Sequence, residues 1–181
     1  MEFNRTKLDG VILVQPDVHG DHRGFFIESY SRQKFVAGGI EPVFVQDNHS
    51  RSVQKGVLRG LHFQVPPFAQ SKLIRVTAGA IFDVVVDLRK GSSSFGKWEG
   101  FELSAANFRM LFVPAGFAHG FCTLTENTEV QYKVDVPYSP SHDSGVRWND
   151  PDIGVAWPVE HPVLSKKDGE LGFFKDFNSP F

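Results

Sequence analysis

The sequence has little of several features that define whole classes of protein. Cys122 is the single cysteine among 181 residues, which excludes an internal disulfide and a metal cluster built from several thiolates. No apolar run approaches the roughly 20 residues of a membrane span, and residues 1–5 lack the charged and then apolar pattern of a secretory signal. We therefore expect a cytoplasmic protein that does not enter a membrane, with a buried, structural Cys122.

An excess of charge of either sign is also missing. The chain has 19 Lys and Arg against 21 Asp and Glu, for a net charge of −2, and no basic block. Nucleic-acid binding is therefore not expected, and any anionic ligand must be met by a few individually placed cations. The length is that of one ordinary domain, so we predict a single domain over residues 1–181.

Aromatic and β-branched residues are plentiful, with 18 Phe in the chain. Short apolar runs separated by turn residues predict strands at residues 11–14, 24–27, 42–45, 72–76 and 80–87. The one short helix is predicted at residues 31–37, closed by two glycines. After residue 148 the alternation is lost, and we expect an irregular C-terminal segment packed on the sheets. The fold class predicted is all-β, an antiparallel sandwich or barrel.

Two histidines stand in apolar, glycine-punctuated runs, His62 in Gly56-Val-Leu-Arg-Gly-Leu-His-Phe-Gln and His119 in Val113-Pro-Ala-Gly-Phe-Ala-His-Gly-Phe. A polar imidazole in such a place needs a partner or performs chemistry. Strand alternation points His62 and Arg59 to opposite faces. If both serve one pocket, the strand must break step between them, and Gly60 is the residue that permits a bulge.

Three further polar residues lie in apolar strands. Tyr132 has the parity of Val130 and Val134, so it either lines a cavity or is a core tyrosine with its hydroxyl at the rim. Asp83 and Asp87 either support a histidine or lie at a sheet edge or turn, and the edge or turn is the simpler interpretation.

Several motifs in one order resemble the dTDP-4-dehydrorhamnose 3,5-epimerase family. They run from near residue 10 to near residue 170 and include Asp21-His-Arg-Gly-Phe-Phe-Ile-Glu, Gln46-Asp-Asn-His-Ser, the two histidine segments, Tyr132-Lys-Val-Asp-Val-Pro-Tyr-Ser-Pro, Trp148-Asn-Asp-Pro-Asp-Ile-Gly and Leu164-Ser-Lys-Lys-Asp. The resemblance implies a cupin-type jelly roll or β-barrel, usually a homodimer, that needs no metal and no organic cofactor.

The resemblance also implies the chemistry. The family's substrate is a dTDP-sugar whose C4 ketone acidifies the hydrogens on C3 and C5, and epimerisation removes such a proton and returns one from the opposite face. His62 is expected to be the base, paired with Asp168, which fixes the imidazole and stabilises its charged form. Lys72 is expected beside the enolate oxygen, and Tyr132 as the acid across the ring.

The binding residues are carried over in the same way. Arg59 and His119 match positions around the diphosphate and sugar, Tyr138 matches the aromatic that stacks on thymine, and Lys167 matches a further binding position. Asp143 stands where the family usually has glutamate, so its carboxylate is one methylene shorter. Positions that contact the nucleotide, some of them across the dimer, are matched by Arg23, Glu28, Gln46, Asp47 and Asn48.

Three alternatives remain open at this point. A metal-dependent cupin needs about three or four ligands, commonly with a His-x-His pair, but Gln64 stands where the second histidine of that pair would be. A non-catalytic sugar-nucleotide-binding cupin would tolerate loss of the base or acid. Within the family, a mono-epimerase would act on C3 or C5 only.

Overall fold

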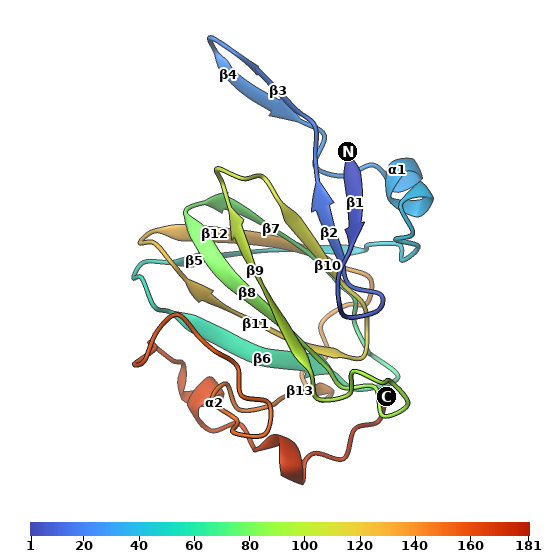
Figure 1. The fold of residues 1–181 in the computed structure, drawn as a ribbon, viewed down its shortest axis with the longest axis vertical. Helices are drawn as coiled ribbons and strands as arrows, with labels where there is room; N and C mark the ends of the chain where they lie inside the picture. The colour runs from blue at the N-terminus through green and yellow to red at the C-terminus, as the bar shows by residue number, and fades with distance from the viewer.

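The computed structural model describes residues 1–181 as two antiparallel sheets stacked face to face (Figure 1). The larger sheet has the order β1 (Glu2–Arg5), β2 (Ile12–Gln15), β10 (Met110–Val113), β7 (Lys72–Ala78), β12 (Thr128–Val134), β5 (Gln46–Ser52). The smaller has the order β13 (Asp143–Gly145), β6 (Leu58–Gln64), β11 (Phe117–Thr123), β8 (Ala80–Asp87), β9 (Trp98–Ser104). The predicted all-β jelly roll is confirmed.

The main core lies between the two sheets, because each strand directs alternate side chains inward. Ile74 and Leu111 from the larger sheet meet Ile81 and Val85 from the smaller one, and all four are completely buried. Two further apolar clusters cover the outer faces. Around Phe35 the helix α1 (Arg32–Ala37) covers the larger sheet, and the C-terminal segment covers the smaller one. The pocket described below is therefore framed by sheets that are supported on both sides.

Four of the five predicted strands are confirmed, at β2, β4 (Gly24–Ile27), β7 and β8, together with the short helix, which ends at Gly38. The strand predicted at residues 42–45 is wrong, because strand β5 begins only at Gln46. Pro42 has no N–H to donate, Val43 and Val45 are exposed, and only the Val45 N–H reaches β12, at the Val134 carbonyl oxygen, so one bond and little burial do not make a strand there. The run is apolar without being part of the sheet.

The irregular C-terminal segment is confirmed. Its only regular pieces are α2 (Lys166–Gly169) and the 3₁₀ turn η1 (Phe174–Asp176). Phe177 and Phe181 pack on Phe63 at ring-centroid distances of 5.0 and 6.0 Å, which fixes the segment against the smaller sheet. Cys122 is buried, as expected. None of the helices combines the length and the apolar character that a membrane crossing requires.

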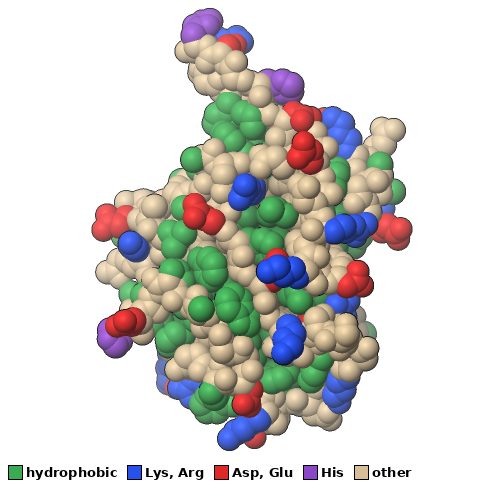
Figure 2. Space-filling model, in the orientation of Figure 1, with side chains coloured by type: hydrophobic (Ala, Val, Ile, Leu, Met, Phe, Trp, Pro, Cys, Tyr) green, Lys and Arg blue, Asp and Glu red, His purple; other side chains and the backbone are tan.

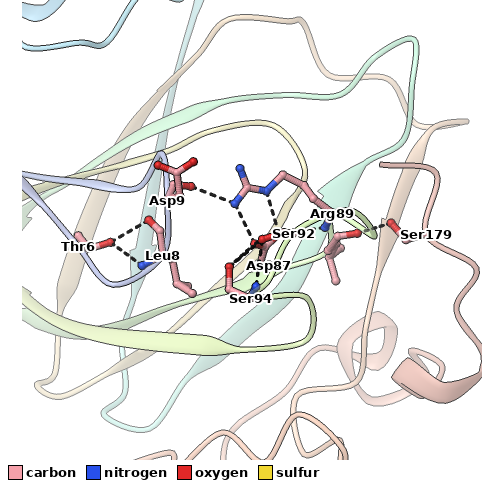
Figure 3. A network of polar contacts seen from close by, with 9 residues as sticks. Thr6, Leu8, Asp9, Asp87, Arg89, Ser92, Ser94 and Ser179 are labelled. Carbon is pink, nitrogen blue, oxygen red and sulfur yellow. Dashed lines mark hydrogen bonds and ion pairs between the residues drawn. The ribbon is translucent and has the colours of Figure 1, made fainter.

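Asp87 organises the turn that follows β8 (Figure 3). Its buried carboxylate accepts hydrogen bonds from the Arg89 guanidinium at 2.8 Å and from the hydroxyls of Ser92 at 2.6 Å and Ser94 at 2.7 Å. Burial by itself raises the pKa of Asp87, but these donors outweigh it and bring the pKa to about 2. The turn-facing interpretation of Asp87 is therefore correct.

The hairpin of β3 (Val18–Asp21) and β4 extends away from the stacked sheets (Figure 1). Phe25 and Phe26 on β4 are 62% and 68% exposed, far more than large aromatic side chains in a core. Elsewhere, on the face shown in Figure 2, acidic and basic side chains are interspersed without a patch of one sign. The projecting hairpin thus carries two large aromatic side chains in contact with solvent.

Candidate active site

The alternation of strand β6 is interrupted by a bulge, as the sequence predicts. His62 pairs with His119 of β11, whereas Arg59 pairs with Phe121, so three residues along β6 span the same distance as two along β11. Gly60 occupies the extra position with φ +126°, and a Cβ there would lie 2.6 Å from the Gly120 Cα. The bulge turns Arg59 and His62 into the same pocket, which confirms the prediction.

That pocket is a cavity of about 290 Å³ between the two sheets. All four predicted catalytic residues line it, together with Arg59, His119 and Lys167. The smaller sheet contributes His62 and His119, while the larger sheet contributes Lys72 and Tyr132. The apolar part of the wall comes from Ile74, Phe121 and Val130. Polar groups on two facing walls with apolar surface between them are typical of a small-molecule site.

His62 and Asp168 form a hydrogen-bonded dyad, between His62 Nε2 and Asp168 Oδ1. Asp168 is held by Ser165, which begins the helix α2: the Ser165 hydroxyl donates to Asp168 Oδ2 at 2.7 Å and accepts from the Asp168 N–H at 3.1 Å. Burial by itself raises the pKa of Asp168, but the hydrogen bonds from His62 and Ser165 outweigh it and lower the pKa. An ionised carboxylate beside the ring stabilises a protonated His62.

Lys72 and Tyr132 face the dyad from the larger sheet. Desolvation lowers the pKa of Lys72 from 10.5 to about 8, although the nearby charges of Asp143 and Asp83 oppose the shift. Burial raises the pKa of the Tyr132 phenol, with a smaller opposing effect from Arg59. At neutral pH the cavity therefore contains an ammonium that is ready to meet an oxyanion and a phenol that retains its proton.

His119 has a carboxylate partner of its own. Both oxygens of Asp83 lie 2.9 Å from His119 Nε2, and Asp83 is completely buried on β8, the strand next to β11. The edge or turn interpretation is therefore wrong for Asp83, because β8 lies between two paired strands. Burial raises the pKa of Asp83, while His119 acts in the opposite direction. Asp83 supports a histidine of the cavity wall.

A smaller cavity of about 150 Å³ adjoins the first and shares His62, Lys72 and Tyr132 with it. Predicted binding residues that line it are Gln46, Asn48, Tyr138 and Asp143. The Tyr138 hydroxyl donates to Asp143 Oδ2 at 2.9 Å, and Lys167 donates to the same oxygen. Asp143 thus reaches two other predicted binding residues despite its shorter side chain.

Three predicted binding residues lie away from both cavities within one chain. Arg23 stands at the hairpin tip and pairs with Asp21, and Glu28 binds Lys34 at 2.9 Å. Asp47 binds Lys133 at 2.8 Å and borders a separate hollow on the larger sheet. Neither Arg23 nor Glu28 lines either cavity, so their assignments as binding residues stay predictions.

The histidines of the cavity do not form a multi-ligand cluster. His62 and His119 are bound to separate carboxylates, and Gln64 uses its side-chain amide on backbone groups. No group of three or more His, Cys, Asp or Glu side chains is placed to hold a metal ion.

Comparison with known proteins decides the family. A family model described as dTDP-4-dehydrorhamnose 3,5-epimerase matches residues 5–176. The chain belongs to the dTDP-4-dehydrorhamnose 3,5-epimerase family. A dTDP-4-dehydrorhamnose 3,5-epimerase of Escherichia coli is 51% identical over 173 residues, which cover 94% of this chain and 93% of that protein.

Solved structures of epimerases agree with this fold. The dTDP-4-dehydrorhamnose 3,5-epimerase of Bacillus anthracis, with TDP and PPi bound, has a TM-score of 0.93 and 52% identity over 95% of this chain and 98% of its own. A Legionella pneumophila epimerase in complex with dTDP-4-keto-L-rhamnose has a TM-score of 0.93 and 41% identity over 98% of this chain and 94% of its own. Both of these epimerases therefore share this architecture over nearly the whole chain.

Sequence reasoning missed two supporting groups. Ser165 lies three residues before Asp168, and this Ser-x-x-Asp spacing is a helix-start pattern that could have revealed the contact. Gln64 was considered only as the residue that interrupts a His-x-His pair. No local pattern signals its three backbone partners, because they are brought to it by two separate loops.

Proposed function

We propose that this protein is a cofactor-independent 3,5-epimerase that converts dTDP-4-dehydro-6-deoxy-D-glucose to dTDP-4-dehydro-L-rhamnose, a step of dTDP-L-rhamnose biosynthesis. One observation carries the proposal: His62 and Tyr132 stand on opposite sheets of one cavity, with Lys72 beside them. A sugar ring between the two walls presents one face to a base and the other to an acid. Inversion at carbon requires this arrangement.

The reaction follows from these groups. His62 takes the proton from C5 or C3, and the electrons of that C–H bond move toward the C4 oxygen, which becomes an enolate. The Lys72 ammonium stabilises this oxygen, and the carboxylate of Asp168 stabilises the imidazolium. Tyr132 then delivers a proton to the carbon from the opposite face. Exchange with water restores the proton on Tyr132 and removes the one on His62.

Recognition of the nucleotide uses the outer part of the pocket. The guanidinium of Arg59 suits the oxygens of a diphosphate, and Lys167 adds a second cation. Tyr138, 57% exposed beside the smaller cavity, offers a ring on which thymine stacks. We further propose a homodimer in which the hairpin of one copy brings Arg23 to the pocket of the other. The cytoplasmic location expected from the sequence stays a prediction.

Hydrogen exchange tests the activity directly. The chelator-treated protein is incubated with dTDP-4-dehydro-6-deoxyglucose in D₂O, and proton NMR follows deuterium entry at C3 and C5. We expect exchange with inversion at both carbons, and loss of both in His62→Asn with dTDP binding retained.

The other outcomes separate the alternatives. Exchange at one carbon identifies a mono-epimerase. No exchange by a wild-type protein that binds the dTDP-sugar identifies a non-catalytic binding protein and overturns the proposal. Activity that the chelator abolishes and a divalent metal restores would identify a metal-dependent enzyme.

A further inference from the structure

A buried glutamine holds the loop that carries Tyr138. The side chain of Gln64, the last residue of β6, makes three hydrogen bonds to backbone groups. Its Nε2 donates to the carbonyl oxygens of Phe68 at 2.8 Å and Pro137 at 3.3 Å, and its Oε1 accepts from the N–H of Ser139 at 2.7 Å. The residues before and after Tyr138 are thus bound to one side chain.

Two other glutamines also bind the backbone of the loop that carries Tyr138. Gln70 Nε2 donates to the Val136 carbonyl at 2.6 Å, and Gln46 Oε1 accepts from the Tyr138 N–H at 3.3 Å. Each residue from 136 to 139 therefore has a backbone group bound by a glutamine. Strand β12 ends at Val134, and the prolines at 137 and 140 cannot donate to a sheet ladder, so side-chain amides satisfy this segment instead.

Gln64 also sets the position of the partner of Tyr138. Its backbone is opposite Asp143 in the register of β6 and β13, and the Tyr138 hydroxyl bonds to the Asp143 carboxylate. One residue thus determines both sides of the Tyr138–Asp143 contact, through its backbone on one side and its amide on the other. Rotation of the Tyr138 ring away from the cavity breaks its bond to Asp143, whereas displacement of its backbone breaks the bonds of the neighbouring residues to Gln64.

The amide of Gln64 has no capacity left for a direct ligand contact on its nitrogen. Both Nε2 hydrogens are engaged, Oε1 already accepts one bond, and the residue is only 4% exposed. A buried amide costs free energy unless it is hydrogen-bonded, and an apolar residue could fill the same strand position without that requirement. The hydrogen bonds to the loop that carries Tyr138 therefore explain why a glutamine occupies this position.

We propose that Gln64 is a positioning residue for nucleotide recognition, which holds the Tyr138 ring at the cavity mouth so that the base of a nucleoside diphosphate stacks on it. The inference rests on the proposed function for the identity of the ligand. Gln64 acts only through the Tyr138 loop and leaves His62, Lys72 and Tyr132 in place. Its loss therefore weakens binding while the chemical step continues.

Substitution Gln64→Met tests this, because methionine has a similar length and makes none of the three bonds. Titration calorimetry with dTDP and steady-state kinetics with the dTDP-4-keto sugar are measured on the purified full chain. We expect the dissociation constant for dTDP and KM to rise about tenfold, as for the loss of a buried hydrogen bond, with kcat within about threefold of wild type. The matched control is Gln15→Met, whose amide bonds to the Asn107 carbonyl and which should bind dTDP like wild type.

A double-mutant cycle with Tyr138→Ala separates positioning from general stability. If Gln64 acts through Tyr138, Gln64→Met has no further effect on dTDP affinity once the ring is absent. Additive losses, or an unchanged dissociation constant in Gln64→Met, would overturn the inference. If Gln64→Met fails to fold, Gln70→Met removes one bond of the same loop and enters the same cycle, where it should weaken dTDP binding a few-fold.

The two proposals fail in different ways. A wild-type protein without hydrogen exchange on the keto sugar contradicts the proposed function. A wild-type protein that catalyses exchange while Gln64→Met binds dTDP normally contradicts the positioning role of Gln64.

Discussion

Lys72 shows how one residue's surroundings change its chemistry. A solvent-exposed lysine is charged at any physiological pH, but the cavity between the sheets lowers the pKa of Lys72 to about 8. Burial disfavours the ammonium, while Asp143 and Asp83 favour it less strongly. A poorly hydrated cation gains more from a new oxyanion than a hydrated one, which suits Lys72 to stabilise an enolate.

This pKa predicts an alkaline limb in the activity. Lys72 is protonated below about pH 8 and neutral above it, so we expect kcat/KM to fall as pH rises through about 8. The phenol of Tyr132, whose pKa burial raises above 10.0, loses its proton only at higher pH. Lys72→Met should lower kcat about 10²- to 10³-fold and abolish the limb near pH 8. The check is kcat/KM from pH 6 to 10 for both proteins.

Two results would contradict this assignment. A wild-type limb that begins only above pH 10 would assign it to Tyr132. Equal changes of dTDP binding and turnover in Lys72→Met would make Lys72 a simple binding residue.

At the scale of the element, the bulge in β6 decides which side chains enter the cavity. The sequence indicated that Arg59 and His62 could share a pocket only if the strand broke step at Gly60, and the register with β11 confirms it. Of the four predicted strands that the structure confirms, β2, β7 and β8 each lie between two paired strands, and β4 belongs to the projecting hairpin. The failure at residues 42–45 came from apolar residues that remain exposed.

Replacement of Gly60 by alanine should therefore be severe. The new Cβ would lie 2.6 Å from the Gly120 Cα and 2.8 Å from the His119 carbonyl oxygen, at a φ of +126° that L side chains rarely adopt. We expect Gly60→Ala to lower the free energy of unfolding by about 3 kcal/mol, from backbone strain and the clash together. We also expect the folded fraction of this variant to have a lower kcat/KM than wild type. Chemical denaturation measures the first effect.

Gly24→Ala is the matched control. Gly24 has a φ of +135° but nothing within 4 Å of an added Cβ, so it should show only the strain, about 1 kcal/mol. Equal destabilisation by both substitutions would show that the close approach of β6 and β11 contributes nothing.

At the scale of the whole molecule, the projecting hairpin leaves apolar surface in water (Figure 1). Phe25 still packs on Phe108, with ring centroids 4.7 Å apart, whereas Phe26 is 68% exposed and near only His19 among the aromatic rings. A hairpin of this kind is stabilised when another surface covers it. This supports the proposed homodimer and would bring Arg23 near a second pocket.

Phe26→Ser tests the dimer. We expect light scattering to give twice the 20.3 kDa chain mass for wild type. Burial of one phenylalanine contributes about 2 kcal/mol and occurs twice in a symmetric dimer, so the variant should dissociate roughly 10³-fold more readily. If Arg23 completes the partner's site, KM should rise as the variant dissociates.

Val53→Ser is the control, because Val53 is 63% exposed and lies outside the hairpin. It should keep the wild-type mass. A monomeric wild-type protein, or a Phe26→Ser dimer as stable as wild type, would contradict the proposed interface.

The sequence by itself determined the fold class and the principal candidates for chemistry. Alternation of apolar residues requires sheets with one face buried, and the order of the motifs identified the family. Local patterns also indicate where the backbone conformation changes, such as at the two glycines that end the helix and at Gly60, where β6 has its bulge. These features depend on neighbours along the chain, so they can be read from it.

Only the tertiary structure decided how the polar groups are paired. Asp83 supports His119 because β8 lies beside β11, and Gln64 holds the loop of Tyr138. The pKa of Lys72 depends on burial and on carboxylates from distant parts of the chain. Such contacts arise from strand register and loop closure, and the local sequence does not encode them.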